Sequence, residues 1–340
     1  MSGLNQRKLT IGRAMHEAMA QEMRRDPSVF LMGEDICRFG GVWGHTAGLV
    51  EEFGRDRIRD TPISEAAFIG AAAGAAAQGM RPIVELMFVD FIGVCLDAVA
   101  GLAAKNYYFT GGQSAVPMVI NTAVGGGYSD AGHHSQVLWP VFAHMPGLKV
   151  VCPSTAHDAK GLMMSAIRDD NPVVFMFHKN LQGVGFLGVV KRSVNEVPVE
   201  PYTVPIGAIA VSREGTDVTV VGVGATVHIA LDAAEEMAKR GVSVEVIDVR
   251  TIQPLDRAGI CRSIRKTGRL VVIDDDYLSY GLTGEIVASV TEQAWAQLKA
   301  APIRIAYPDI TCPFSPPMER FALPNAAKVI AAIEQIMRAH

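Results

Sequence analysis

Apolar positions in the first half of the chain follow two different periods. Over residues 8–25 they recur with a helical period, with Ile11 and Met15 on one side, and Asp26-Pro27 ends this pattern. Short apolar runs predict buried strands at 29–33, 82–86, 116–121, 149–152 and 172–177. Helical patterns lie between these runs, at 65–79, 91–108 and 155–169. Buried strands that alternate with helices predict an α/β domain with a mostly parallel sheet.

The alternation stops over residues 183–205, which are rich in glycine, proline and charged side chains. It then resumes with strands predicted at 218–221, 244–248, 269–274 and 303–307. Helices are predicted at 226–240, 255–265, 281–297 and 324–338. A chain of 340 residues is long for one compact core. We therefore predict two parallel-sheet α/β domains, residues 1–195 and a smaller domain at 196–340.

Composition narrows the function classes. Hydrophobic residues make up 49% of the chain and charged residues 19%, so extra surface is expected to be buried against partner subunits. The net charge is −4 and no segment concentrates Lys and Arg, which excludes a nucleic-acid footprint and a polybasic membrane patch. The N-terminus lacks the apolar core of a signal peptide, and the longest uncharged stretch, 106–129, is broken by Pro117 and glycines. The five cysteines are scattered without a CxxC pair, which favours a reducing, cytoplasmic location.

The segment 61–65 stands before a helix made almost entirely of small residues. Ser64 is a suitable N-cap, and Glu65 at the helix start could simply complement the helix dipole. Every residue from 70 to 77 is Gly or Ala, which would let another backbone approach closely and predicts a helix buried at an interface. A carboxylate at the buried end of such a helix costs free energy unless it has a partner. This cost favours a functional Glu65.

Two glycine-containing loops are further candidates. Gly125-Gly126-Gly127 leads to His133-His134, which suits proton transfer but equally suits a solvated surface loop. The segment 222–227 half-matches a dinucleotide fingerprint, and a tight strand-to-helix turn is the better interpretation. The sequence contains no Gly-Asp-Gly segment of the kind that anchors the diphosphate and magnesium of thiamine diphosphate.

At this point the sequence resembles the β subunits of heterotetrameric 2-oxo acid dehydrogenases, the first components of the pyruvate, branched-chain and acetoin dehydrogenase complexes. The resemblance covers nearly the whole chain. It rests on the combination of segments 61–65, 85–91 and 134–136 and is supported by those at 32–35, 144–151, 158–162 and 247–250. It implies a transketolase-like pyrimidine-binding domain followed by a transketolase C-terminal-type domain.

The resemblance also implies site residues. Glu65 matches the glutamate that hydrogen-bonds the aminopyrimidine of thiamine diphosphate and activates it, and Met87 and Phe91 match positions lining the pyrimidine pocket. From the residues alone, Met87 and Phe91 would be ordinary core side chains. His134 matches a histidine near the reacting carbon, suited to proton transfer during reductive acylation of lipoate. A structural potassium ion in some members corresponds to Met118, Ala166, Ile167, Asp169 and Asn171, which otherwise form a helix end and a turn before a proline.

The implied assembly has two α and two β subunits, with magnesium held by the α subunit and a dihydrolipoyl acyltransferase as the acyl acceptor. His133 departs from the Gln or Tyr common at its position, so the substrate stays open, although the run 85–95 leans toward acetoin dehydrogenases. Two alternatives remain. A transketolase-like half-enzyme acting on sugar phosphates would need a basic rim that the sequence does not show, and a non-catalytic scaffold would not need Glu65 and His134.

Overall fold

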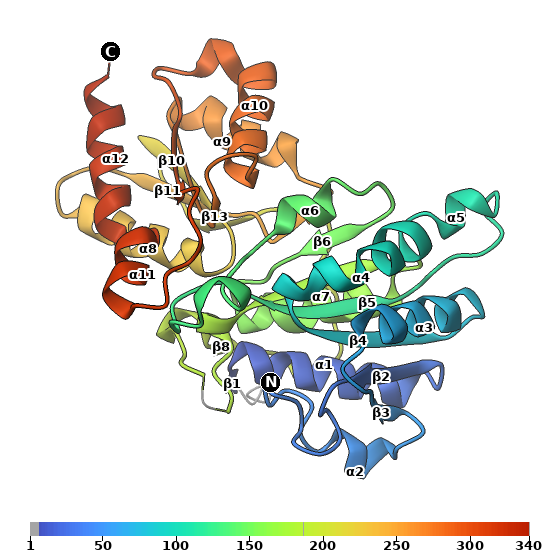
Figure 1. The fold of residues 1–340 in the computed structure, drawn as a ribbon. Helices are drawn as coiled ribbons and strands as arrows, with labels where there is room; N and C mark the ends of the chain where they lie inside the picture. Colours follow the sequence, from blue (N-terminus) through green and yellow to red (C-terminus); the bar gives the residue numbers. More distant parts are fainter. Residues whose placement is uncertain (1–6, 186, 340) are drawn as a thin grey trace, which may run out of the picture. The chain divides into compact units, whose positions relative to one another are not determined.

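The computed structural model describes residues 7–185 and 187–339. These residues form two compact units (Figure 1). The first contains the described residues up to Val124 together with Val141–Ile206, and the second contains Gly125–Pro140 together with Gly207 and the residues after it. The sequence predicted one boundary, near residue 195. One boundary in the sequence cannot describe these units, because residues 125–140 belong to the second unit although they precede residues 141–206 of the first. The predicted domain limits stay a prediction.

The sheet of the first unit is parallel, with its strands in the order β6-β7-β5-β4-β2-β3. The strands are β2 (Val29–Gly33), β3 (Ile58–Asp60), β4 (Arg81–Phe88), β5 (Val119–Val124), β6 (Lys149–Val151) and β7 (Val173–His178). A short antiparallel pair joins β1 (Lys8–Leu9) to β8 (Asn195–Glu196). The side chains of β5 and β7 are buried throughout, as expected for central strands covered on both faces.

Helices of the first unit include α1 (Ile11–Arg25), α2 (Leu49–Phe53), α3 (Glu65–Ala77), α4 (Ile92–Asp97), α5 (Asn106–Phe109) and α7 (Ala156–Arg168), and α6 (Trp139–Ala143) spans the division between the units. The connections β3–α3–β4 and β4–α4–β5 run along the sheet in one direction, and β6–α7–β7 runs in the other. Because such crossovers are right-handed, α3 and α4 cover one face and α7 covers the other. The α7 start is set by Thr155, whose hydroxyl accepts the Asp158 backbone N–H.

Two local predictions in this unit are wrong. Residues 91–108 were expected to form one helix, but α4 is followed by a π-helix at Ala98–Ala103 and then by the single turn of α5. Gly93 and Gly101 lower the helix propensity of this stretch. Ser64 occupies the N-cap position of α3, but its side chain accepts no helix N–H; its backbone carbonyl accepts from Ala67 and Phe68 instead.

The second unit contains a mixed sheet in the order β14-β13-β10-β11-β9. The strands of this sheet are β9 (Ala210–Arg213), β10 (Val218–Gly222), β11 (Val244–Asp248), β13 (Leu270–Tyr277) and β14 (Ile303–Tyr307). The short strand β12 (Thr251–Gln253) is not part of this sheet. Only the edge strand β9 is antiparallel to its neighbour in this described sheet. The helices are α8 (Ala225–Ala238), α9 (Arg257–Thr267), α10 (Leu282–Ala294), α11 (Pro316–Ala322) and α12 (Ala326–Arg338).

These elements confirm the predicted α/β class with two largely parallel sheets. The 222–227 segment is a tight strand-to-helix turn: Gly224 has a φ of 54°, and the Thr226 hydroxyl bonds the Val223 backbone and the Ile273 carbonyl. A small three-residue strand such as β3 carried too little apolar pattern to be predicted. Within residues 7–185 and 187–339, no helix is long and apolar enough to cross a membrane.

Candidate functional site

The carboxyl ends of the first unit's strands bring several predicted residues to one edge of the sheet. Glu34 directly follows β2, and Glu65 is the first residue of α3, shortly after β3. Met87 lies at the end of β4, and Phe91 follows it in the turn Val89–Phe91. Parallel α/β sheets bind ligands at this edge, because loops and helix N-termini converge there.

Glu65 lies in a carboxylate-rich environment. It is partly buried, and its charge acts on both Glu34 and Cys95. Burial, followed by the charges of Glu65, Asp35 and Glu85, raises the pKa of Glu34, which is only 8% exposed. Burial and the Glu65 charge raise the pKa of the Cys95 thiol to about 12, so that thiol is neutral at physiological pH. The negative charge of Glu65 thus disfavours ionisation of Glu34.

Met87 and Phe91 are both partly exposed and are not part of the buried core. The Met87 carbonyl accepts the Trp43 indole N–H at 3.1 Å, so the loop 34–48 is fastened to the end of β4. The Phe91 ring packs edge-on against Phe88, with ring centroids 5.5 Å apart. Partly exposed apolar side chains beside a carboxylate could hold the flat face of an aromatic ring.

A buried polar network lies beneath this edge. His45, only 1% exposed, has Nε2 at 2.9 Å from the Glu85 carboxylate and 3.0 Å from the Asn121 amide nitrogen. Its Nδ1 is 3.0 Å from the Gln182 amide nitrogen, and its carbonyl lies 3.0 Å from His16 Nδ1. The network ties the loop 34–48 to β4 and β5, which fixes the floor of the site.

His133 and His134 belong to the second unit, on the loop 125–140. His133 ends the short turn Ala131–His133 and is exposed, whereas His134 is partly buried. The Gly125 N–H donates to the Gln136 carbonyl at 2.9 Å and closes the loop at its base. The solvated-loop interpretation therefore describes His133 better than His134.

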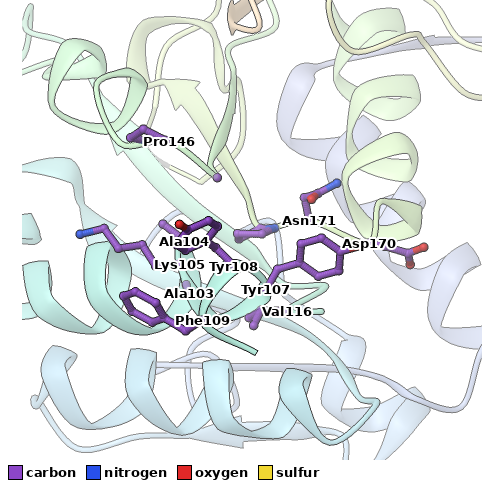
Figure 2. A pocket seen from close by; sticks show the side chains of 12 residues that line it. Ala103, Ala104, Lys105, Tyr107, Tyr108, Phe109, Val116, Pro146, Asp170 and Asn171 are labelled. Atoms are coloured by element: carbon purple, nitrogen blue, oxygen red, sulfur yellow. The ribbon is translucent and has the colours of Figure 1, made fainter. Parts of the chain in front are cut away.

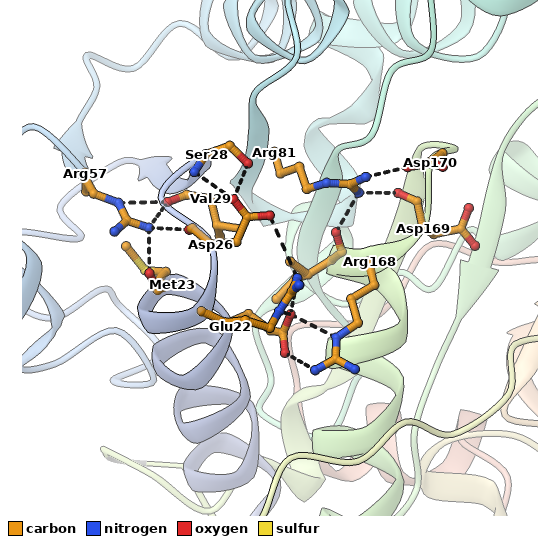
Figure 3. Close-up of polar contacts among 12 residues, drawn as sticks. Glu22, Met23, Asp26, Ser28, Val29, Arg57, Arg81, Arg168, Asp169 and Asp170 are labelled. Carbon is orange, nitrogen blue, oxygen red and sulfur yellow. Dashed lines mark hydrogen bonds and ion pairs between the residues drawn. The ribbon is translucent and has the colours of Figure 1, made fainter.

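The residues matched to the potassium site gather at the C-terminal end of α7. Figure 3 shows the Arg81 guanidinium reaching this turn, where Nη1 donates to the carbonyls of Ile167 and Asp169, each at 3.0 Å. Its Nη2 pairs with the Asp170 carboxylate. A carbonyl oxygen has two lone pairs, so these bonds leave the second lone pair for an ion.

The other predicted potassium ligands lie in the same turn or beside it. The Met118 carbonyl accepts the Val173 N–H at 2.9 Å, and the Ala166 carbonyl faces the Asp169 N–H at 3.4 Å. Burial alone would raise the pKa of Asp169, but hydrogen bonds from Lys149 and Asn171 outweigh it and hold that pKa below its usual value. The described residues hold no cluster of three or more His, Cys, Asp or Glu side chains placed for a metal. A potassium ion would rest on carbonyl oxygens, so it stays a prediction.

A cavity of about 510 Å³ opens beside this turn (Figure 2). Its wall combines the apolar and aromatic side chains of α5 and its surroundings with the turn before β7, and includes Tyr107, Tyr108, Phe109, Val116 and Asn171. Of the residues predicted to act, Asn171 alone is among those lining it. This cavity is therefore separate from the edge that carries Glu65.

Comparison with known proteins decides the family. The transketolase pyrimidine-binding domain matches residues 7–183, and the transketolase C-terminal domain matches 207–329. The β subunit of acetoin:2,6-dichlorophenolindophenol oxidoreductase from Cupriavidus necator is 46% identical, over 98% of both chains. The chain belongs to the family of thiamine-dependent dehydrogenase β subunits. The 2-oxoisovalerate dehydrogenase β subunit of Bacillus subtilis is 42% identical to this β subunit, over 95% of this chain and 97% of its own length.

Other relatives widen the range of substrates in the family. A pyruvate dehydrogenase β subunit from Rhizobium meliloti is 40% identical, over 98% of this β subunit and 71% of its own length. A solved structure described as a split-gene transketolase, an inactive tetramer of β chains, matches with a TM-score of 0.76 over 97% of this chain and 99% of its own. At 20% identity, that likeness shows the fold alone. These comparisons confirm the predicted family and fold.

Sequence reasoning missed two groups in this β subunit. Glu34 was noted only as part of the segment 32–35 that supports the family resemblance, yet the fold places its carboxylate within the electrostatic reach of Glu65. A strand end followed by an acidic residue was the available signal. The His45–Glu85 pair could not have been found, because 40 positions separate partners that only the folded loop brings to 2.9 Å.

Proposed function

We propose that this β subunit supplies half of the active site of a thiamine-diphosphate-dependent acetoin dehydrogenase. An α subunit would hold the diphosphate and magnesium, and the acetyl group would pass to lipoate on a dihydrolipoyl acyltransferase. Acetoin is preferred over pyruvate or 2-oxoisovalerate because relatives at 46% and 41% identity are named for it. The same relatives favour a dehydrogenase over a sugar-phosphate enzyme or a scaffold. A cytoplasmic location stays a prediction.

The observation that carries the proposal is the position of Glu65. It begins α3 at the carboxyl edge of the sheet, with Glu34 beside it and partly exposed Met87 and Phe91 nearby on the chain from β4. This set fits an aminopyrimidine, which needs a carboxylate partner at one ring nitrogen and apolar contacts on its face. When bound, thiamine diphosphate supplies a nucleophilic thiazolium carbon, and its thiazolium ring acts as the electron sink.

Glu65 would hydrogen-bond the ring nitrogen of the pyrimidine and would hold or return a proton at its carboxylate there. Glu34, whose pKa is raised by burial and by the charges of Glu65, Asp35 and Glu85, would be able to hold a proton beside Glu65. Met87 and Phe91 would orient the ring and exclude water from its face. On the loop 125–140, His134 would hold or deliver a proton at its imidazole as the lipoyl sulfur reacts.

The absence of a Gly-Asp-Gly diphosphate anchor from the sequence supports the need for a second chain. The testing experiment combines purified β subunit with an α subunit of the acetoin dehydrogenase family and measures reduction of dichlorophenolindophenol with acetoin, pyruvate and 2-oxoisovalerate. Acetoin should be oxidised fastest. A higher rate with pyruvate or 2-oxoisovalerate would instead assign this β subunit to the 2-oxo acid dehydrogenases of the family.

A further inference from the structure

The loop that carries His134 holds an unusual share of strained backbone. Ser129, Ala131 and Leu138 all have φ between 56° and 60°, in the left-handed region that side chains with a Cβ rarely adopt. They are three of the six non-glycine residues with positive φ in the described ranges. Backbone strain of this kind persists only where several surrounding contacts hold the conformation in place. Contacts outside the loop must therefore hold it in place.

Glu319 makes such contacts at the start of the loop. Its side chain is 1% exposed, and it lies on α11, 192 positions from Gly127 and 190 from Ser129. One carboxylate oxygen accepts the Gly127 N–H at 2.7 Å. The other accepts the Ser129 N–H at 2.9 Å and the Ser129 hydroxyl at 3.2 Å. Two backbone N–H groups and a hydroxyl thus converge on one buried carboxylate.

The fit around this carboxylate is tight. A Cβ added at Gly126 would stand 3.1 Å from Glu319 Oε1 and 3.4 Å from Leu323. The Cys312 thiol lies 3.7 Å from the same oxygen. Backbone N–H groups bonded to a charged acceptor form stronger bonds than neutral pairs, and a buried donor left without an acceptor is costly. Glu319 therefore fixes the loop by charge as well as by shape.

The other end of the loop is held in the same way. The Trp139 indole N–H donates to both Asp274 carboxylate oxygens, at 3.2 and 3.1 Å. The neighbouring Asp276 accepts the Leu138 N–H. Both aspartates are buried on β13. His134 lies between the two anchored ends, so its position depends on them.

We propose that Glu319 is a positioning residue that sets the conformation of the loop 125–140 and thereby the placement of His134. The inference rests on the role of His134 in the proposed function and adds a residue to it. Glu319 acts through the Gly127 and Ser129 backbone and touches no reacting atom. Its loss should therefore reproduce the loss of His134 and leave the chemistry at Glu65 in place.

The test uses the complete complex with its α subunit and the variant Glu319→Gln. The amide keeps the shape but places an NH₂ group against one of the two backbone N–H donors. Two rates are compared: acetoin-dependent reduction of dichlorophenolindophenol, which needs no lipoate, and acetylation of a free lipoyl domain. The matched control is Glu334→Gln, which removes an equivalent charge on α12 from the exposed pair with Arg240.

Glu319→Gln should retain dye reduction within about twofold and lose about tenfold or more of the lipoyl acetylation rate, as expected for a misplaced acid or base. His134→Ala should lower lipoyl acetylation at least as much, and the double variant should be no slower in that assay than His134→Ala alone, because both changes remove one function. Glu334→Gln should match the parent in both assays. Equal loss of both rates in Glu319→Gln, no loss, or additive losses in the double variant would overturn the inference.

Two further variants keep the outcome decisive. If Glu319→Gln does not fold, Gly126→Ala retains the glutamate and pushes its Oε1 with the added methyl group. The same selective loss of lipoyl acetylation is expected, and unchanged acetylation refutes the positioning role. His134→Ala alone tests the proposed function. Full lipoyl acetylation by that variant would refute the role of His134 and, with it, the inference about Glu319. A loss of acetylation in His134→Ala but not in Glu319→Gln would keep the role of His134 and contradict only the inference about Glu319.

Discussion

Gly74 offers a test of assembly because the described part of the chain leaves open space beside it. It lies in the interior of α3 and is exposed, and a Cβ built there would meet nothing within 4 Å. Its φ is not in the left-handed region. Glycine costs about 1 kcal/mol relative to alanine in a helix interior. Gly74→Ala in the isolated chain should therefore raise the melting temperature of its unit by about 2–4 °C, as expected for a domain of roughly 150–250 residues.

A partner packed on the outer side of α3 would explain the glycine. The inner face of α3 buries Phe68, Ile69 and Ala72, whereas Ala67, Gly70, Ala71 and Gly74 share the opposite side one turn apart and are exposed or partly exposed. Small residues at this spacing let helices approach at the low end of the about 8–10 Å interaxial range. We expect a second copy of the chain, or its α subunit, to pack on this side.

Gly74→Leu should leave the isolated chain folded, because open space surrounds the position. It should nevertheless break assembly, since widening a packed contact by about 1 Å already forfeits up to about half of its dispersion energy. Light scattering on the purified complex measures the mass, and calorimetry on the chain measures its stability. Ala238→Leu, at an exposed site on α8, is the control. An unchanged complex mass with normal activity for Gly74→Leu would refute the reasoning, as would a chain that fails to fold.

Three further predictions concern the second unit and the potassium site. His134→Ala should lower lipoyl acetylation by ~100-fold while thiamine diphosphate affinity changes little, as titration calorimetry can show. Burial raises the pKa of Asp276 to about 6, above its usual 3.8, so the folded state holds a proton that the unfolded state loses and stability falls as pH rises between these values. The difference in melting temperature between Asp276→Asn and the parent should therefore shift in favour of the variant as the pH rises from 4 to 6. A difference that stays constant with pH would contradict this. Replacing potassium by tetramethylammonium should lower the melting temperature, and Asn171→Ala should abolish that difference.

The sequence was informative where local pattern decides structure. The apolar run at 29–33 became β2 with the same limits, because a buried parallel strand needs little more than apolar side chains. Glu65 could be singled out because its helix is chemically unusual. The loop 125–140 could not be assigned correctly, since its contacts with Glu319 span 190 positions. The effect of the Glu65 charge on Glu34 likewise depends on the register of β2 beside β3, since the two residues follow these strands.

The failed local predictions have a similar origin. Ser64 has the right side chain for an N-cap, but its backbone, with φ −161° and ψ 73°, turns away from the geometry in which a cap bonds the first N–H groups. The helix predicted over 91–108 keeps a helical period, yet Gly101 and its neighbours form a π-helical stretch that periodicity does not reveal. The side-chain type of Ser64 is suited to an N-cap, but the backbone conformation determines whether its hydroxyl can bond the helix N–H groups.

Acetoin-dependent dye reduction is the most direct measurement of the central claim that Glu65 completes a thiamine diphosphate site shared with an α subunit. Three samples are compared at saturating thiamine diphosphate and magnesium: the complex, the complex carrying Glu65→Gln, and the β subunit alone. The complex should turn over, the β subunit alone should be inactive, and Glu65→Gln should assemble normally but react ~100-fold more slowly or worse, because an amide is a poor proton acceptor. Near-normal turnover by Glu65→Gln, or any turnover by rigorously purified β subunit, would contradict the account.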